Sequence, residues 1–190
     1  NTSGNTWTAV YTANASDTDG AVTYSIAFSD TSGNAGTAVT SGSGSVTTDT
    51  SAPTLSNVSI TSDNSTSTLA KANDDVTLTF TASEAIGTPV VTFRSGGDAI
   101  TDGSVVYSNT SGNTWTAVYT ANASDTDGAV TYSIAFGDTT GNAGTAVTSG
   151  SGSVTTDTTA PTLSNASITS DNSTSTKAKA GDDVTLTFTA

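Results

Sequence analysis

The sequence predicts an all-β fold of tandem β-sandwich domains, and three observations support this prediction. Apolar and polar residues alternate with a period of two in several short segments. No segment shows a convincing period of 3.6, and the chain repeats itself at an interval of 108 residues. Alternation is typical of strands that bury one face, and this repeat length suits one small domain with its own core.

The repeat covers every residue that can be compared. Residues 1–82 match residues 109–190 with six mismatches in 82 pairs, which are Ser29/Gly137, Ser32/Thr140, Ser51/Thr159, Val58/Ala166, Leu69/Lys177 and Asn73/Gly181. Such identity indicates an array of one module rather than an enzyme with a unique site. We expect residues 1–50 to be the C-terminal part of one repeat, 51–158 a complete repeat and 159–190 the N-terminal part of the next, within a longer periodic polymer.

The complete repeat is expected to contain seven strands. Val76, Leu78 and Phe80 alternate with threonines, and Trp115 and Tyr119 share one face of a later segment. Turn signals such as Ser95-Gly-Gly-Asp98, Thr101-Asp-Gly103 and Asp125-Thr-Asp-Gly128 separate the strands. The expected strands, lettered A to G in chain order, span residues 54–60 (A), 76–82 (B), 89–94 (C), 104–108 (D), 114–121 (E), 129–137 (F) and 146–156 (G).

Seven short strands in one repeat fit an Ig-like sandwich. The Cys…Trp…Cys pattern of antibody domains is missing, and we expect Trp115 to fill the core. A propeller or a β-helix would need a shorter period.

Composition excludes several classes of function. The chain has 17 acidic residues against 4 basic ones, a net charge of −13. Nucleic acids and anionic membranes bind through Lys and Arg, so neither is an expected partner. The sequence shows no signal peptide and no transmembrane run, although a piece from the middle of an array would lack both.

The chain contains no Cys, Met or His. Disulfides, thiolate or imidazole metal sites, and Ser–His or Cys–His acyl transfer are therefore impossible. Paired carboxylates could suggest a glycosidase, but tandem copies, shallow loops and the lack of aromatic clefts argue against one. We expect no enzymatic activity. Glycosylation at triplets such as Asn14, Asn57, Asn64 and Asn122 stays open.

Three motifs in order resemble a known family. Asp157-Thr-Thr-Ala-Pro-Thr-Leu163 resembles the linker that opens bacterial Ig-like repeats, Thr77-Leu-Thr-Phe-Thr-Ala-Ser-Glu84 resembles their second strand, and Phe136-Gly-Asp-Thr-Thr-Gly-Asn-Ala-Gly144 resembles their F–G corner. Such repeats occur in giant bacterial surface adhesins, including calcium-dependent RTX-type ones. The resemblance covers the whole chain and implies a non-catalytic extender stalk, extracellular or on the bacterial surface.

One group of candidate metal ligands lies in the loop after residue 121. Asp125 and Asp127 precede Gly128, and Asp17 and Asp19 repeat them in the first copy. Alternate carboxylates followed by glycine can wrap a hard cation such as Ca²⁺. The A–B loop at the same end of the sandwich would help with Asp63, Asp74 and Asp75, repeated as Asp171, Asp182 and Asp183. The alternative is an ordinary Asp-Gly turn.

A second group should gather at the other end of the sandwich. Strand order brings the B–C loop with Glu84, the F–G loop with Asp138 and Asn142, and the linker with Asp49 together. In the adhesin repeats that this chain resembles, calcium stiffens the domain junction. By that analogy Asp49, Glu84 and Asp138 share a cation, and Asp30 and Asp157 serve neighbouring junctions. The alternative is that Asp138 and Asn142 only cap a tight turn.

These observations predict a stalk in which each module adds length and each Ala-Pro linker limits bending, because proline fixes φ. The expected partners are neighbouring repeats of the same chain. A filament in which like chains pack laterally is the alternative. A carbohydrate-binding module is a third possibility, but it would need exposed aromatic residues, and the sequence indicates none.

Overall fold

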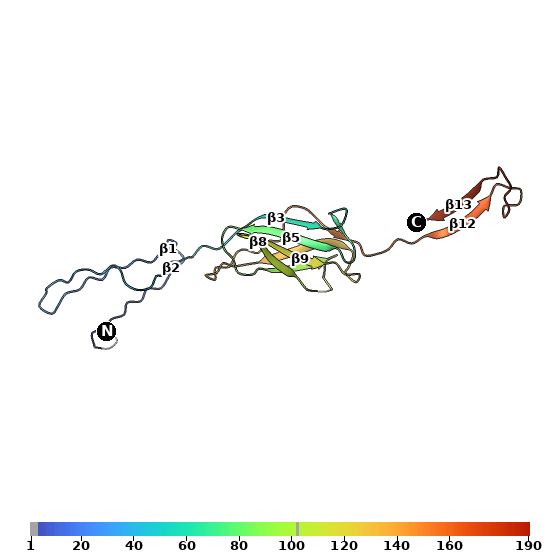
Figure 1. Cartoon of the computed structure of the whole chain (residues 1–190). Coiled ribbons are helices and arrows are strands. Elements are labelled where there is room, and N and C mark those ends of the chain that lie inside the picture. The colour runs from blue at the N-terminus through green and yellow to red at the C-terminus, as the bar shows by residue number, and fades with distance from the viewer. Residues whose placement is uncertain (1–3, 102) are drawn as a thin grey trace.

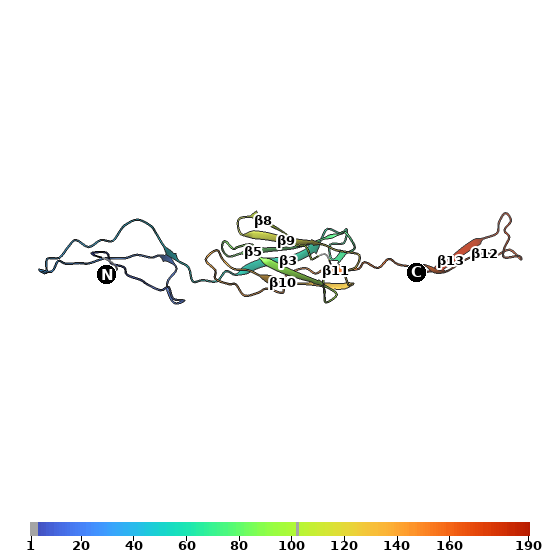
Figure 2. The same cartoon turned by 90° about the horizontal axis from the view of Figure 1, so that it is seen from below.

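The computed structural model describes residues 4–101 and 103–190, and it consists of strands and loops without a helix. One β-sandwich occupies the middle of the chain, with extended segments leaving it at opposite ends (Figures 1 and 2). The predicted all-β sandwich is confirmed. Among the described residues, no helix is long and apolar enough to cross a membrane.

Two sheets form the sandwich. The first has the order β3-β5-β9-β8, with strands Leu55–Ser62, Asp75–Ala82, Thr114–Thr120 and Val106–Ser111. The second has the order β4-β11-β10-β6-β7, with strands Leu69–Ala70, Thr155–Thr156, Gly128–Ala135, Val90–Ser95 and Asp98–Ala99. All neighbours are antiparallel except β4 and β11.

The alternation in the sequence sets the core. In β5 each apolar residue is buried and each threonine between them is half-buried, as the period of two requires. Phe80 lies opposite Trp115 in β9, which fixes the register of this pair of strands. Phe93 of the second sheet packs on Tyr119 of the first, with ring centroids 4.8 Å apart. The two sheets therefore meet through side chains that the alternation assigns to one face.

Of the aromatic residues that alternation places on inner faces, Phe80, Tyr119, Tyr132 and Phe136 are buried. Trp115 is only half-buried and packs against the core from its margin. Tryptophan is rarely fully buried because of its size, and this one is the second residue of β9, next to the end of the strand. The expectation that Trp115 fills the core is therefore met only in part.

The predicted strands agree with β3, β5, β6, β8, β9 and β10 to within about two residues at each end, except that β8 ends three residues later than predicted. The predicted last strand is different. Residues 146–156 form isolated bridges at Val147 and Ser151 and only a two-residue strand, β11. Two short strands, β4 and β7, were not predicted. The predicted turn Thr101-Asp-Gly103 includes Asp102, which lies outside the described residues.

The flanking copies form fewer strands. In the first copy, β1 (Gly20–Ala21) pairs with β2 (Thr47–Thr48). In the last copy, β12 (Ser164–Ser170) pairs with β13 (Val184–Thr189). Apolar residues of both copies face solvent, because the strands that cover their counterparts in the sandwich are not in this chain.

Candidate metal centre at the domain junction

The F–G corner of the sandwich is organised by a single carboxylate. Oδ1 of Asp138 accepts hydrogen bonds from the backbone N–H groups of Thr140, Gly141 and Asn142 at 2.8, 2.6 and 2.9 Å. Aspartate favours such turns because its short side chain reaches its own backbone. Asp30 forms the same corner in the first copy, with bonds to Ser32 and Asn34. The turn is therefore encoded locally.

The incoming linker docks on this corner. The side-chain amide of Asn142 donates to the backbone oxygen of Asp49 at 3.1 Å, and the Thr140 hydroxyl donates to Asp49 Oδ2 at 3.3 Å. Pro53, four residues further along, is fully buried. The carboxylate of Asp49 is thereby held beside Asp138.

Glu84 completes the group from the loop after β5. The backbone N–H of Ser83 donates to the oxygen of Thr54 at 2.9 Å, which ties the start of this loop to the linker. One ligand oxygen from each of Asp49, Glu84 and Asp138 lies within 4.8 Å of the others. Three segments far apart in sequence thus converge at one end of the sandwich, as strand order predicts.

Electrostatic repulsion is not relieved inside this cluster. Burial, followed by repulsion from Asp49, Asp138 and Asp19, raises the pKa of Glu84 above its usual value. Burial also raises the pKa of Asp138, but hydrogen bonds from Asn142, Gly141 and Thr140 outweigh it and leave the pKa lowered. Among the described residues, the ion pairs are Lys71–Asp74 and Lys179–Asp182, so neither compensates the cluster.

The donor set fits a hard divalent cation. All three side chains offer oxygen, and two oxygens on one Ca²⁺ ion lie at most about 5 Å apart when each bond is about 2.4 Å. The separation of 4.8 Å is within this limit. Asn142 directs its Nδ2 at Asp138 Oδ2, at 2.7 Å, and therefore acts as a donor rather than a metal ligand. Three carboxylates supply fewer ligands than Ca²⁺ prefers, so backbone oxygens or water would complete the shell.

The other predicted group is occupied by protein donors. Asp125 is buried and accepts hydrogen bonds from the backbone N–H groups of Thr101 and Asn122, at 2.8 and 2.9 Å. Its counterpart Asp17 accepts from the Tyr11 hydroxyl and from the backbone of Asn14. These residues act as turn caps, in line with the alternative reading of the Asp-Gly motif.

Asp127 has a role that the sequence did not suggest. Its Oδ1 accepts from the backbone N–H of Thr158 at 2.7 Å, and its Oδ2 accepts from the Thr159 hydroxyl at 2.6 Å. Asp19 makes the same bonds to Thr50 and Ser51, at 2.7 and 2.5 Å. The carboxylate therefore fastens the outgoing linker to the domain behind it. The recurring signal was a pair of hydroxyl residues before each Ala-Pro.

The A–B loop carboxylates are also engaged within their loop. Asp74 pairs with Lys71 Nζ at 2.7 Å and accepts from Asn64 at 2.6 Å. Asp63 accepts from the backbone of Asp75 at 2.9 Å. In the last copy the equivalent bonds recur at Asp171, Asp182 and Asp183. No group of three carboxylates forms here within the described part of the chain.

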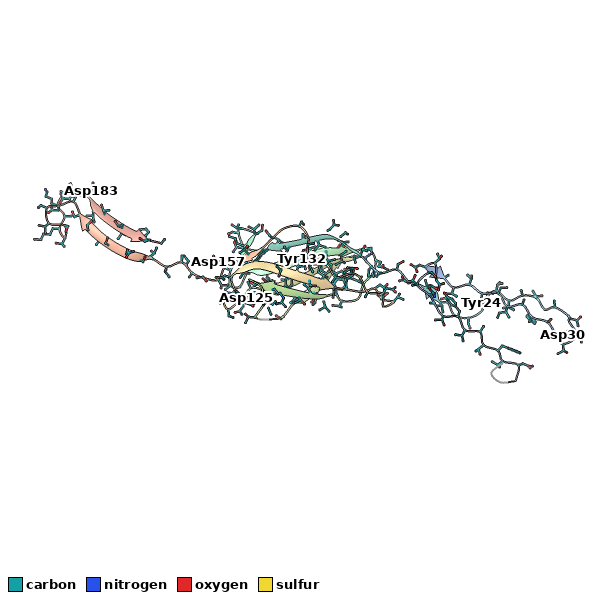
Figure 3. All side chains as sticks on the ribbon, turned by 180° about the vertical axis from the view of Figure 1, so that it is seen from behind. Tyr24, Asp30, Asp125, Tyr132, Asp157 and Asp183 are labelled. Carbon is teal, nitrogen blue, oxygen red and sulfur yellow. The ribbon has the colours of Figure 1, made fainter. Side chains whose placement is uncertain are left out.

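Asp30 and Asp157, predicted to serve neighbouring junctions, belong to no cluster of three carboxylates among the residues that the structure describes. Asp30 lies at the tip of the first copy that is distant from the sandwich, and Asp157 lies beside the outgoing linker (Figure 3). The Asp157 carboxylate accepts a hydrogen bond from the backbone N–H of Thr159, at 3.1 Å. The residues that match Glu84 for these two junctions are not in this chain.

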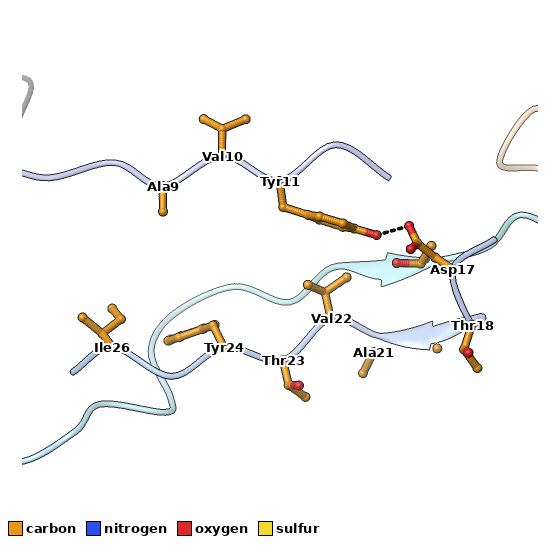
Figure 4. Close-up of a pocket in the computed structure, with 12 residues that line it drawn as sticks. Ala9, Val10, Tyr11, Asp17, Thr18, Ala21, Val22, Thr23, Tyr24 and Ile26 are labelled. Carbon is orange, nitrogen blue, oxygen red and sulfur yellow. Dashed lines mark hydrogen bonds between the residues drawn. The ribbon is translucent and has the colours of Figure 1, made fainter. Parts of the chain in front are cut away.

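A hollow in the first copy is the exposed face of an incomplete core. Val10, Tyr11, Val22, Tyr24 and Ile26 line it (Figure 4). Each corresponds, at the offset of 108 residues, to a residue of the sandwich, such as Tyr132 for Tyr24 and Ile134 for Ile26. The hollow is therefore open core rather than a binding site.

Comparison of the chain with protein-family models, with curated proteins and with solved structures gives no match.

Proposed function

We propose that this chain is a non-catalytic repeat of an extended stalk, secreted or anchored on a bacterial surface, whose domain junctions are stiffened by calcium. The observation that carries the proposal is the convergence of Asp49, Glu84 and Asp138 at the place where one repeat meets the next. The resemblance of the linker and corner motifs to bacterial adhesin repeats supports the location and the calcium.

The path of the chain suits a stalk. The linker enters the sandwich at one end and leaves it at the opposite end (Figure 1). Each repeat therefore adds its long dimension to the length of the array. Near-identical copies give every junction the same geometry, so the contribution of a single repeat is multiplied along the polymer.

Calcium would act on the charge of the junction. Without a cation, three carboxylates repel one another and favour an open linker. Asp49 belongs to the linker, while Glu84 and Asp138 belong to the following domain, so a shared ion would hold the linker against that domain. A ligand that binds only the ordered junction also raises stability, by about 2.7 kcal/mol at a hundredfold excess over Kd.

Small-angle scattering on a chain with two complete repeats tests this function. We expect a larger radius of gyration in millimolar calcium than in chelator, together with a higher melting temperature. Asp138→Asn should abolish both effects. Asp98→Asn removes a carboxylate at an exposed site outside the cluster, so it should leave the calcium response intact. An unchanged radius and melting temperature in calcium and chelator would refute a calcium-stiffened stalk.

A further inference from the structure

The end of the repeat pairs in parallel with its beginning. Ser151 bridges Ser59 of β3, and two residues of β11 run parallel to β4. The backbone bonds are Ile60 N–H to Ser151 O at 3.0 Å, Ser151 N–H to Val58 O at 2.8 Å, Thr155 N–H to Thr68 O at 2.9 Å and Asp157 N–H to Ala70 O at 2.9 Å. The last segment therefore contacts the first segments of both sheets.

Two glycines make this approach possible. A Cβ on Gly150 would overlap the carbonyl oxygen of Val58, and a Cβ on Gly152 would overlap that of Ile60. Glycine within a strand often marks such a close approach of two backbones. Residues 149–153 read Ser-Gly-Ser-Gly-Ser, a composition that weakens a strand unless the lack of side chains is needed.

The first copy provides an internal control. There the same sequence lies without a β3 strand beside it, because the first part of that repeat is not in the chain. A Cβ on Gly44, the counterpart of Gly152, would meet nothing, and one on Gly42 would meet only the Tyr24 hydroxyl. The clash with backbone thus arises from β3, while the positive φ that Gly152 shares with Gly44 favours glycine there in both copies.

The direction of pairing matters when the chain is pulled. The linker before β3 and the linker after β11 leave the sandwich at opposite ends (Figure 1). Because the first and last segments run parallel, tension on the two linkers slides them past each other. The bonds between the two segments then carry the load together. A hairpin pulled from one end would instead open one bond at a time.

We infer that residues 150–157, packed on β3 and β4, form a mechanical clamp that resists unfolding when tension is applied along the stalk. Gly150 and Gly152 are its positioning residues, since they let the two backbones meet. The clamp deepens the proposed stalk function and rests on it for the source of the tension. It requires no metal, because its bonds lie between backbone groups.

Single-molecule force measurements on the 190-residue chain test the clamp by direction. The natural chain has no cysteine, so introduced ones define the pulling points. Ala52→Cys with Ala160→Cys, both at exposed positions, loads the repeat along the stalk. Ala52→Cys with Ser111→Cys pulls from one end only. β5 lies between β3 and β9 and pairs with both, which places Leu55, Ala82 and Thr114 at the same end of the sheet, next to the two introduced cysteines. We expect a clearly higher unfolding force along the stalk, and equal forces would overturn the clamp.

A matched pair of substitutions tests the glycine. Gly150→Ala should lower the unfolding force along the stalk and leave the force from one end nearly unchanged. Gly42→Ala introduces the same methyl group beside a tyrosine hydroxyl, but without β3, and should change neither force. If Gly150→Ala prevents folding, the comparison of pulling directions still decides. Loss of direction dependence would overturn the clamp without affecting calcium-dependent extension, and loss of the calcium response would leave the clamp intact.

Discussion

The complete repeat and its partial copies have nearly the same sequence but differ in what they bury. Phe80 is fully buried in the sandwich, whereas Phe188, its counterpart in the last copy, is 54% exposed. Tyr132 is 9% exposed and its counterpart Tyr24 is 47% exposed. Identical residues thus reach a core only when strands from the rest of the repeat cover them.

The local hydrogen bonds do not differ in this way. Asn64 donates to Asp74 at 2.6 Å in the sandwich, and Asn172 donates to Asp182 at 2.5 Å in the last copy. The comparison teaches that loops and caps depend on residues a few positions apart, while the core depends on pairing between distant strands. Substitutions made in matched positions of two copies can separate these contributions.

The largest effect should come from the core. We expect Phe80→Ala to lower the free energy of unfolding by about 3–5 kcal/mol, the usual cost of deleting a buried aromatic side chain. Phe188→Ala should change it by less than about 0.5 kcal/mol, as at most surface positions. Urea denaturation followed by circular dichroism measures both. Similar losses in the two variants would show that the last copy has a core of its own.

The next effect concerns acid stability. The hydrogen bond from Asn64, followed by bonds from Lys71, lowers the pKa of Asp74 to about 2. A carboxylate whose pKa is lowered by folding stabilises the fold at pH values above its ordinary pKa. This contribution disappears as the pH falls from about 4 to about 2. Allowing for solvent screening, it amounts to about 1–2 kcal/mol.

Asp74→Asn should therefore flatten the dependence of the melting temperature on pH in this acid range. Asp182→Asn, in the last copy, is the matched control and should leave the melting of the sandwich unchanged. An acid profile of Asp74→Asn that coincides with the unsubstituted chain would contradict the assignment.

A smaller effect of opposite sign is expected at the junction. The pKa of Glu84 is raised, so its ionised form destabilises the folded junction, and stability improves as the pH falls through the folded pKa. At neutral pH without calcium, Glu84→Gln should raise the melting temperature, and it should weaken the response to added calcium. Asp98→Asn removes the same charge at an exposed site outside the cluster. If both variants behaved alike, net charge rather than the cluster would be responsible.

The smallest effect should be at Leu69, where the other copy has Lys177. Leu69 is 46% exposed although it belongs to β4, as suits a position that holds lysine in the other copy. Leu69→Lys should change the free energy of unfolding by less than about 0.5 kcal/mol. Ala70→Lys, at a buried neighbour, should be strongly destabilising in the same denaturation assay.

The alternation of apolar residues was sufficient to predict most of the sandwich, because β5, β9 and β10 each bury one face. It could not reveal β4 or β7, since two-residue strands carry no period. The last segment lost its regular strand for a different reason. The backbone oxygens of Val58 and Ile60 lie so close to residues 150 and 152 that only glycine fits there. Because glycine has no side chain, the alternation of apolar and polar residues is lost in this segment.

The sequence predicted one of the two candidate metal sites better than the other. Asp49, Glu84 and Asp138 were brought together from strand order alone, because loops at one end of a sandwich must meet. Asp125 and Asp127 could not be assigned in this way. An aspartate before glycine can bind a cation or cap backbone N–H groups, and only the position of Thr101 and Thr158 decides between these roles.

Each linker is held by the domains on both of its sides, and this determines how the end-to-end length of the array grows with the number of repeats. Asp19 holds Thr50 and Ser51 from behind, and Asn142 holds Asp49 from ahead. Segments joined by free joints span a distance that grows with the square root of their number. When each joint keeps its angle, the span grows in direct proportion instead. In the proposed stalk, each duplicated module would extend the array by a full module length, so copy number alone would set how far the stalk reaches.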